Sequence, residues 1–392
     1  MATVLVSLLA FVSLREPKLS FWEKIVDADF RPFAHCDLAP LCRSCIRIRN
    51  TNGTVNAVDG PGFIHSQRKR ASVGMVQLTV DRYKLADFQI LLNLADQPNR
   101  SPCVLNYFRT KGSKEKNPLM PFPRFYLEDT FGSLFRNGMP AWAEVMKLSA
   151  NLRRRYPWGE RKRKIYFSGR PHPAKVHLLR FALQHQDSFH LHFAIVSPHC
   201  WLSLSHERGL SKPNVGDDSS CHSSIRKTIV GCDYCMDCTL CSECLASGFC
   251  KFNETSPEEM FHFTHQIYAD GNTRSERMKH LLLTGSCILN VESKWDEFYT
   301  PLLRPYVNYV PISSDLSNAS RAMEIADDRL CEPMIRRNIQ FANDVLSEDS
   351  ILAYVAITLG KIVQARSRRG FSPAPKSILN SLYLYSSASL VE

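Results

Sequence analysis

Short apolar runs alternate with stretches of helical spacing from residue 88 onward, and this alternation constrains the fold more than any other feature of the chain. Apolar runs of strand length separated by helices are typical of parallel sheets covered on both faces. We therefore expect an α/β fold with mostly parallel sheets. The predicted strands are Phe88–Leu94, Lys164–Ser168, His190–Val196, Ser286–Val291 and Val307–Pro311. The predicted helices are Phe21–Phe33, Lys175–Gln186, Ser275–Leu283, Trp295–Leu303 and, for most of its length, Arg321–Lys361.

The length of 392 residues exceeds what one hydrophobic core usually holds, so we expect two domains. The predicted N-terminal domain covers residues 21–160 and the predicted C-terminal domain covers residues 161–365. Residues 200–260 are polar and rich in cysteine, with no periodicity, and are read as an insertion in the second domain. Residues 366–392 are serine-rich and basic and form a predicted tail.

The N-terminal apolar run, Val4–Leu14, resembles the core of a signal peptide, although no positive residue precedes it and Arg15 follows it directly. A signal within residues 1–20 and an ordinary buried element both fit this run. No stretch reaches the roughly 18 apolar residues that span a bilayer, so we expect no membrane span. Sequons for N-glycosylation, which weakly favour secretion, begin at Asn52, Asn99, Asn253 and Asn318.

Six of the 14 cysteines fall between Cys232 and Cys250, in a series of C-x2-C steps. Such spacing suits zinc thiolates, but zinc modules usually separate two pairs by a longer loop, which is missing here. Disulfides in an oxidising compartment, a metal site and a redox role all remain open for this segment.

The formal net charge of +11 favours a polyanionic partner such as nucleic acid, an anionic membrane or a diphosphate. The excess is concentrated in three basic runs, which otherwise read as solvated faces. No nucleic-acid-binding motif accompanies them, so we expect no nucleic-acid partner. The runs are Arg68–Arg70, Arg153–Arg155 and Arg161–Lys164.

A glycine followed by a basic helix marks the segment that begins at Asp270. Gly271 lies at a predicted strand–helix junction, where a glycine allows the backbone to approach a ligand closely. The helix that follows carries Arg274, Arg277 and Lys279 near its start. Helix N-terminal amides and cationic side chains both favour phosphate, although a loop and a solvated helix fit the same residues.

The order of motifs across residues 270–317 resembles the C-terminal signature of glycosyltransferase family 90, which includes Rumi-type and KDEL-containing protein O-glucosyltransferases and fungal capsule-associated proteins. Members of this family carry an Asp-Gly turn and helix, a strand beside a Gly-Ser pair, an aromatic Glu-Phe segment and a Tyr-x-Pro strand. The matching residues are Asp270-Gly271, Ser275, Arg277, Gly285-Ser286, Trp295, Glu297-Phe298-Tyr299, Leu303, Pro305, Tyr309-Val310-Pro311 and Asp315-Leu316-Ser317.

The resemblance extends upstream to Leu91–Pro98 and to Pro157–Arg170, and it covers residues 20–365 apart from the Cys-rich insertion. Two positions depart from the family pattern. Lys175 and Val176 stand where an arginine usually follows the Phe-x-Gly-Arg motif, and Asn308 stands where a histidine is usual.

This resemblance implies a GT-B-like arrangement of two Rossmann-like domains that face a cleft, with a UDP-sugar on the C-terminal domain. It implies inverting, metal-independent transfer of glucose or xylose to a Ser or Thr hydroxyl of an EGF-like acceptor in the endoplasmic reticulum lumen. The UDP-sugar is then a substrate, UDP-glucose or UDP-xylose, and no cofactor or metal ligand is expected.

Site residues follow from these matches. Asp96 corresponds to the aspartate of the family's Asp-x-Pro motif and is the expected catalytic base, because a carboxylate can accept the proton of the attacking hydroxyl. Fixed cations and amides must then stabilise the leaving diphosphate. The predicted UDP-sugar-binding residues are Ser168, Gly169, Arg170, Lys175, Gly271, Ser275 and Arg277.

Two other functions remain open. The departures at Lys175 and Asn308 fit a non-catalytic binding module, and the Cys-rich segment with the basic runs fits a zinc- or nucleic-acid-binding protein.

Overall fold

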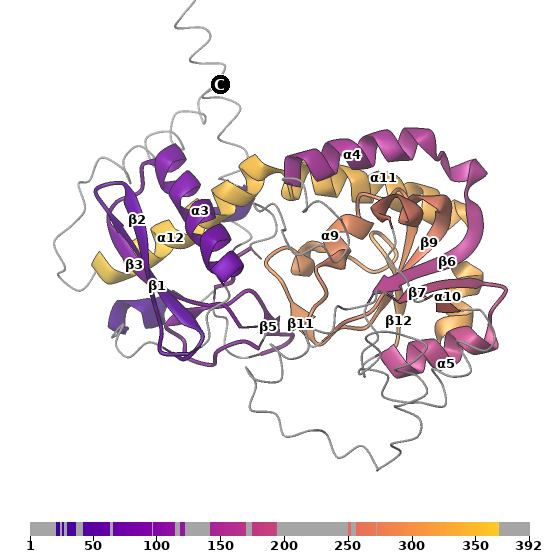
Figure 1. The fold of residues 1–392 in the computed structure, drawn as a ribbon, viewed down its shortest axis with the longest axis horizontal. Helices are drawn as coiled ribbons and strands as arrows, with labels where there is room; N and C mark the ends of the chain where they lie inside the picture. The colour runs from indigo at the N-terminus through magenta and orange to yellow at the C-terminus, as the bar shows by residue number, and fades with distance from the viewer. Residues whose placement is uncertain are drawn as a thin grey trace, which may run out of the picture. The chain divides into compact units, whose positions relative to one another are not determined.

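The computed structural model divides the chain into two compact units, whose elements are labelled in Figure 1. One unit takes its residues from 1–127 and 344–392, and the other takes its residues from 128–343. In this division the first boundary follows residue 127, and the chain returns to the first unit from residue 344. The structure describes residues 21–23, 26, 30–36, 42–62, 66–95, 97–113, 118–121, 142–169, 175–193, 250–251, 256–271 and 273–367. The apolar run Val4–Leu14 and the cysteines Cys232–Cys244 lie outside these residues.

The first unit contains a sheet with strand order β2-β1-β3-β4. The strands are β1 (Cys45–Thr51), β2 (Thr54–Asp59), β3 (Phe88–Asn93) and β4 (Val104–Leu105), and the short β5 (Arg109–Thr110) follows. Strand β1 is antiparallel to both β2 and β3, and only β3 and β4 are parallel. The prediction of mostly parallel sheets is therefore wrong for this unit. The reason lies in the turn, where Asn52 and Gly53 have φ of 49° and 83°, as in the tight turns that join antiparallel neighbours.

Two long helices accompany this sheet, and they come from opposite ends of the sequence. They are α3 (Ser66–Tyr83) and α12 (Glu348–Ser367), with a short 3-10 helix, η1 (Arg31–His35). Helix α12 lies beside α3 (Figure 1), and its residues from Ile351 to Leu359 are all buried. The Trp22 indole donates to Ser350 Oγ at 3.0 Å, and the Tyr354 hydroxyl donates to the Leu119 carbonyl at 2.7 Å. No helix among the described residues has both the length and the apolar character needed to cross a bilayer.

The second unit confirms the predicted parallel sheet. Its strands are β6 (Lys162–Gly169), β7 (Phe189–Phe193), β8 (Cys250–Lys251), β9 (Phe263–Tyr268), β10 (Cys287–Val291) and β12 (Val310–Ile312). They lie in the order β12-β10-β9-β6-β7-β8, and each described pair is parallel. When the strands are numbered in chain order within the unit, they follow the strand order of the Rossmann doubly wound sheet. The strand order reverses between β6 and β9, while the strands themselves stay parallel.

Helices cover both faces of this sheet. The helices of the unit are α4 (Trp142–Arg155), α5 (Val176–Gln184), α9 (Arg277–Leu281), α10 (Ala319–Ile325) and α11 (Asp328–Val345). In the described part of the unit, the 3-10 helices η3 (Trp158–Glu160), η5 (Pro257–His262) and η6 (Thr300–Leu302) connect the elements. Apolar residues of α5, α10 and α11 pack with Phe167 and Leu289 in one core. Helix α9 and η5 contact β9, whose Tyr268 lies outside that core.

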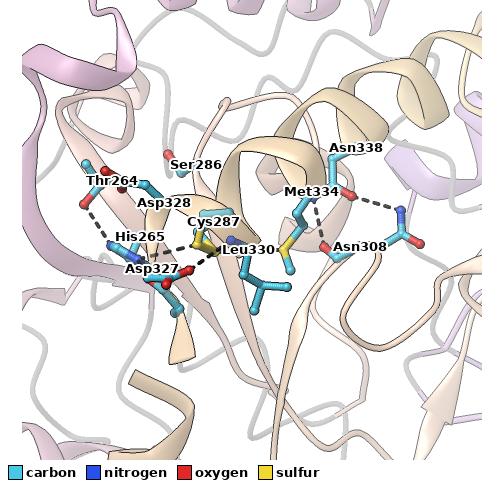
Figure 2. Close-up of a disulfide and its surroundings, with 12 residues drawn as sticks. Thr264, His265, Ser286, Cys287, Asn308, Asp327, Asp328, Leu330, Met334 and Asn338 are labelled. Atoms are coloured by element: carbon cyan, nitrogen blue, oxygen red, sulfur yellow. Dashed lines mark hydrogen bonds between the residues drawn. A yellow bond between two sulfur atoms is a disulfide. The ribbon is translucent and has the colours of Figure 1, made fainter. Parts of the chain in front are cut away.

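A disulfide joins the sheet to α11, between Cys287 of β10 and Cys331 (Figure 2). Beside it, the His265 ring lies 2.8 Å from both Thr264 Oγ1 and the Ala326 carbonyl. Further disulfides join Cys36 to Cys103 and Cys42 to Cys45 in the first unit. Disulfide use, one of the readings left open by the cysteine count, is therefore confirmed for these six cysteines.

Two of the predicted helices do not form as expected. Within Trp295–Leu303 the chain makes the short strand β11 (Trp295–Asp296), a turn and η6, because Pro301 lacks the amide that a continuing helix needs. Within Phe21–Phe33, Val26 and Phe30 lie outside any helix, so one continuous helix is excluded. The helices predicted near residues 175–186 and 321–361 are confirmed.

Asn308, one of the two departures from the family pattern, has a packing role (Figure 2). Its side-chain amide donates to Asn338 Oδ1 at 3.0 Å, and the Asn338 amide donates to the Asn308 carbonyl at 2.9 Å. The pair is buried between the loop before β12 and helix α11.

Replacing Asn338 with alanine should therefore destabilise the protein, because it removes the Asn338 partners of the buried Asn308 side-chain amide and backbone carbonyl. We expect Asn338→Ala to lower the free energy of unfolding by about 1–3 kcal/mol in urea titrations. Asn343→Ala, an exposed change on the same helix, is the control and should change stability little. Equal stability of the two variants would contradict the packing role of the pair.

Candidate functional site

The predicted phosphate-binding segments meet at the carboxyl ends of β6 and β9. These strands are neighbours in the sheet, with Ile165 opposite His265 and Tyr166 opposite Gln266. After β6 the chain continues toward α5 and β7 on one side, and after β9 it continues toward β10 on the other. The connections diverge from this point, which is where doubly wound sheets bind their ligands.

Arg277 extends from α9 to the end of β6. Its guanidinium donates to the Ser168 carbonyl and lies 4.5 Å from the centroid of the Phe167 ring. Burial lowers the pKa of Arg277 to about 10, with Tyr268 and Tyr166 acting in the opposite direction, so the side chain carries a positive charge at neutral pH. A cation stacked on a ring and bonded through one nitrogen retains further N–H groups for an anion.

Gly169 makes room for this guanidinium. A Cβ at this position would lie 3.1 Å from Arg277 Nη2 and 3.1 Å from Phe167 Cζ, closer than nearly all such contacts. A larger residue at this position would therefore force Arg277 or Phe167 to shift by a few tenths of an ångström. Arg170, which follows it, lies outside the described residues.

Lys175 places a second cation against the same ring. The side chain is 6% exposed, and its Nζ lies 5.4 Å from the centroid of Phe167. Lys175 immediately precedes α5, so its position is set by the chain that leaves β6. Lys175 lies one position before the usual arginine position, which Val176 occupies. The Phe167 ring therefore lies close to two cations, Arg277 and Lys175.

Asp270 lies at the end of β9 and is held by hydroxyl groups. Its carboxylate accepts from Ser293 Oγ at 2.6 Å and from the Tyr268 hydroxyl at 3.0 Å. Burial raises the pKa of Asp270 above its usual value, while the Ser293 bond and the positive charges of Arg274 and Lys175 act to lower it. The Tyr268 hydroxyl also accepts from the Ser275 amide at 2.8 Å, and this ties the turn to the strand.

The turn between β9 and α9 differs from its predicted form in two respects. Helix α9 contains only five residues, so its dipole contributes less than a long helix would. The nearest atom to a Cβ added at Gly271 would be the Thr273 carbonyl oxygen at 4.0 Å, so packing does not require this glycine. Its lack of a side chain leaves space beside the backbone. Ser275 Oγ accepts from the Arg277 amide at 3.4 Å at the start of the helix.

Arg274 and Lys279, which also stand near the start of this helix, do not join Arg277. Arg274 donates to the Trp295 carbonyl at 3.1 Å and stacks on Tyr268, and Lys279 lies 5.3 Å from the centroid of Trp142. Both are less than 9% exposed. Their charges act inside the unit.

Glu297 balances these internal cations, a role that motif matching did not assign. The side chain is 4% exposed. Burial raises the pKa of Glu297 to about 7, against the lowering effects of Arg274, the Tyr299 hydroxyl and Lys279. The available signal in the sequence was the place of Glu297 in the aromatic Glu-Phe segment of the family pattern.

In the first unit, two buried asparagines hold the loop that follows β3. Asn93 accepts from the Ala95 amide at 3.1 Å and donates to the Gln97 carbonyl at 2.7 Å. Asn106 accepts from Asn93 Nδ2 at 3.0 Å and from the Asn99 amide at 2.8 Å. Asp96 itself lies outside the described residues, but the residues on either side of it are fixed by this network. The family match over Leu91–Pro98 includes Asn93 but gave it no role, and the sequence analysis did not identify Asn106.

Comparisons with known proteins agree with the motif pattern. The family model for glycosyl transferase family 90 matches residues 62–364. Protein O-glucosyltransferase 1 of Mus musculus is 37% identical over 86 residues, which are 21% of this chain and 22% of that protein. Uncharacterized protein 179R of Invertebrate iridescent virus 6 is 31% identical over 121 residues, 29% of this chain and 10% of that protein.

Among solved structures, Anabaena Alr3699/HepE in complex with UDP aligns with 82% of this chain and 78% of its own, at 11% identity and a TM-score of 0.25. A TM-score this low does not establish a shared fold.

The family match covers most of the chain, so this protein belongs to glycosyl transferase family 90. The aligned segments span about a fifth of the length of the protein O-glucosyltransferase 1 sequences that it matches.

Glu297 should make stability depend on pH. Its folded-state pKa of about 7 lies above the usual 4.5, so the folded protein binds more protons than the unfolded chain between these values. Stability must therefore fall as pH rises from 4.5 to about 7. Relative to Glu297→Gln, which cannot ionise, the wild-type free energy of unfolding should decrease across this window and then level off.

Urea titrations of both proteins at several pH values measure this difference. Glu348→Gln, an exposed change at the start of α12, is the matched control and should follow the wild type. A constant difference between wild type and Glu297→Gln across the window would contradict the shifted pKa.

Proposed function

We propose that this chain transfers glucose or xylose from a UDP-sugar to a Ser or Thr hydroxyl of a folded protein acceptor such as an EGF-like domain. The observation that carries the proposal is the position of Arg277, which stacks on Phe167 and donates to the Ser168 carbonyl at the point where the strand order reverses. Family membership and the names of the O-glucosyltransferase relatives support the same reaction class. We further propose a GT-B-like arrangement and residence in the endoplasmic reticulum lumen.

In the proposed reaction, the acceptor oxygen attacks the anomeric carbon while the bond to the UDP oxygen breaks. The electron pair of that bond passes to the diphosphate, and the hydroxyl proton passes to the Asp96 carboxylate. Attack opposite the leaving group inverts the configuration of the sugar. Asp96 follows a strand that ends in a tethered loop, which suits a base that must hold one position.

Fixed cations supply the stabilisation of the leaving UDP in this proposal, and no metal ion is assigned to it. Arg277 and Lys175 both lie against the Phe167 ring, and cations fixed in this way need little reorganisation when charge develops on the diphosphate. Arg170 is proposed as a third cation. Ser168, Gly169, Gly271 and Ser275 are proposed to contribute backbone or hydroxyl contacts.

The rival functions receive less support from the described residues. Asn308 packs against Asn338, and Lys175 supplies a cation beside Phe167 one position before the usual arginine, so we do not read either departure as a decayed site. Two of the basic runs are partly structural, because Arg153 donates to the Leu283 carbonyl at 2.5 Å and Arg161 to the Gly285 carbonyl at 2.9 Å.

The sugar can be identified without a known acceptor. Hydrolysis of UDP-glucose, UDP-xylose and other UDP-sugars by the full chain should be highest for the true donor. Absence of UDP release from every UDP-sugar, together with absence of UDP binding in calorimetry, would favour the non-catalytic binding module.

Asp96→Asn should remove the base and keep donor binding. We expect UDP release in the presence of a folded EGF-like acceptor to fall by about 10²- to 10⁴-fold, while UDP affinity is unchanged. Asp81→Asn, an exposed change on α3, is the control and should retain full turnover. Full turnover by Asp96→Asn would show that another group accepts the proton.

Arg277→Ala should weaken UDP binding, because it removes the charged donor fixed on Phe167. We expect a loss of affinity of about 10- to 100-fold in calorimetric titrations with UDP. Arg180→Ala, an exposed arginine on α5, should bind UDP as the wild type does. Unchanged affinity in Arg277→Ala would place the diphosphate elsewhere.

A further inference from the structure

Strand β7 and the 3-10 helix η5 bring two imidazoles and a carboxylate together. His190 and His192 are two residues apart on β7, so their side chains lie on the same face of the sheet. That face is opposite the core formed by Phe189 and Leu191. Glu259 extends from η5 to meet both rings, and nothing in the proposed transfer reaction uses these three residues.

The three side chains have the spacing of ligands around one ion. His190 Nε2 lies 3.3 Å from Glu259 Oε1, and His192 Nδ1 lies 3.1 Å from Glu259 Oε2. All three ligand atoms are within 4.8 Å of one another. Ligands about 2.0–2.1 Å from a tetrahedral zinc ion lie about 3.3 Å apart, so the observed separations require little movement.

The direction of the His190 ring favours a shared ion over a simple ion pair. Its Nε2 is buried and, despite the short distance to Glu259, makes no hydrogen bond of acceptable geometry. When two metal ligands both point at one ion, their ligand atoms lie close together but do not point at each other, as His190 Nε2 and Glu259 Oε1 do here.

The surroundings would hold such ligands in place. The His190 ring stacks on Phe263 at 4.7 Å and on Tyr166 at 5.9 Å between centroids, and His192 is 3% exposed. An ionised carboxylate with two imidazoles is a ligand set that zinc and related divalent ions prefer.

We propose that His190, His192 and Glu259 bind one divalent transition-metal ion of the zinc class, with water in the fourth position. The ion links β7 to η5 and thereby stabilises the second unit. His192 pairs in register with Ser168, so the ion would brace the strand beside the one that carries the proposed donor site. This inference does not depend on the transferase reaction, and its test does not measure activity.

Cobalt(II) is the spectroscopic probe for this site. The full chain is stripped with a chelator and titrated with Co²⁺ while visible absorption is recorded. We expect one equivalent to give d–d bands without thiolate charge transfer, since the three ligands offer nitrogen and oxygen only. Thiolate bands would report any separate binding by Cys232–Cys250. Added Zn²⁺ should displace the cobalt and raise the melting temperature by about 5–10 °C at a hundredfold excess over its Kd.

The variants His192→Gln and Glu259→Gln should lose this equivalent of Co²⁺ and the stabilisation by Zn²⁺, and any thiolate bands should remain. His177→Gln, an exposed histidine on α5, is the matched control and should keep both. Retention of the nitrogen–oxygen bands in both cluster variants would overturn the proposal. So would their absence from the wild type, a result that holds even if the variants fail to fold.

Discussion

The parallel pairing of β6 with β9 is the constraint on which the second unit depends. These strands are neighbours, and the chain leaves them toward opposite sides of the sheet. The connections therefore diverge and leave a crevice at the carboxyl ends of the two strands. Arg277 and Lys175 converge there from elements that follow different strands. Both depend on Phe167, which offers one ring to two cations and extends the apolar core to the edge of the site.

Buried charge is the second theme of this unit. The family motif around the Asp-Gly turn contains several charged residues, but most of them serve the fold. Arg274 and Lys279 face inward, and Glu297 balances them. Removing one member would leave the others uncompensated in a medium of low polarity, where an unpaired charge is costly. Arg277 is the cation of this segment that reaches the neighbouring strand β6, where it donates to the Ser168 carbonyl.

The strands could be predicted from the sequence because their apolar runs are short and continuous. Phe88–Asn93, Lys162–Gly169 and Cys287–Val291 lie where the predicted runs lie. The antiparallel pairing in the first unit was harder to predict from the sequence. It depends on the turn at Asn52 and on the pairing of β1 with β3, which comes much later in the chain. The segment after Trp295 failed as a helix because its apolar spacing is helical while Pro301 prevents continuation. Among the candidate site residues, motif order selected Arg277, and Lys175 was noted beside a departure from the motif. Asn93 was matched without a role and Asn106 was missed, because both act through local turn hydrogen bonds. The histidines of β7 were missed because they meet Glu259, which is distant in the sequence.

Helix α12 has a consequence for the synthesis of this protein. The strands of the first unit leave the ribosome early, but helix α12, whose Ser350 accepts the hydrogen bond of the buried Trp22 indole, emerges only after residues 128–343. Until then the first unit lacks part of its core and presents apolar surface that aggregates readily. The second unit is contiguous in the sequence and can fold at once. During synthesis the second unit can therefore complete its fold before the first unit does, and the early segments of the first unit remain without α12 in the meantime.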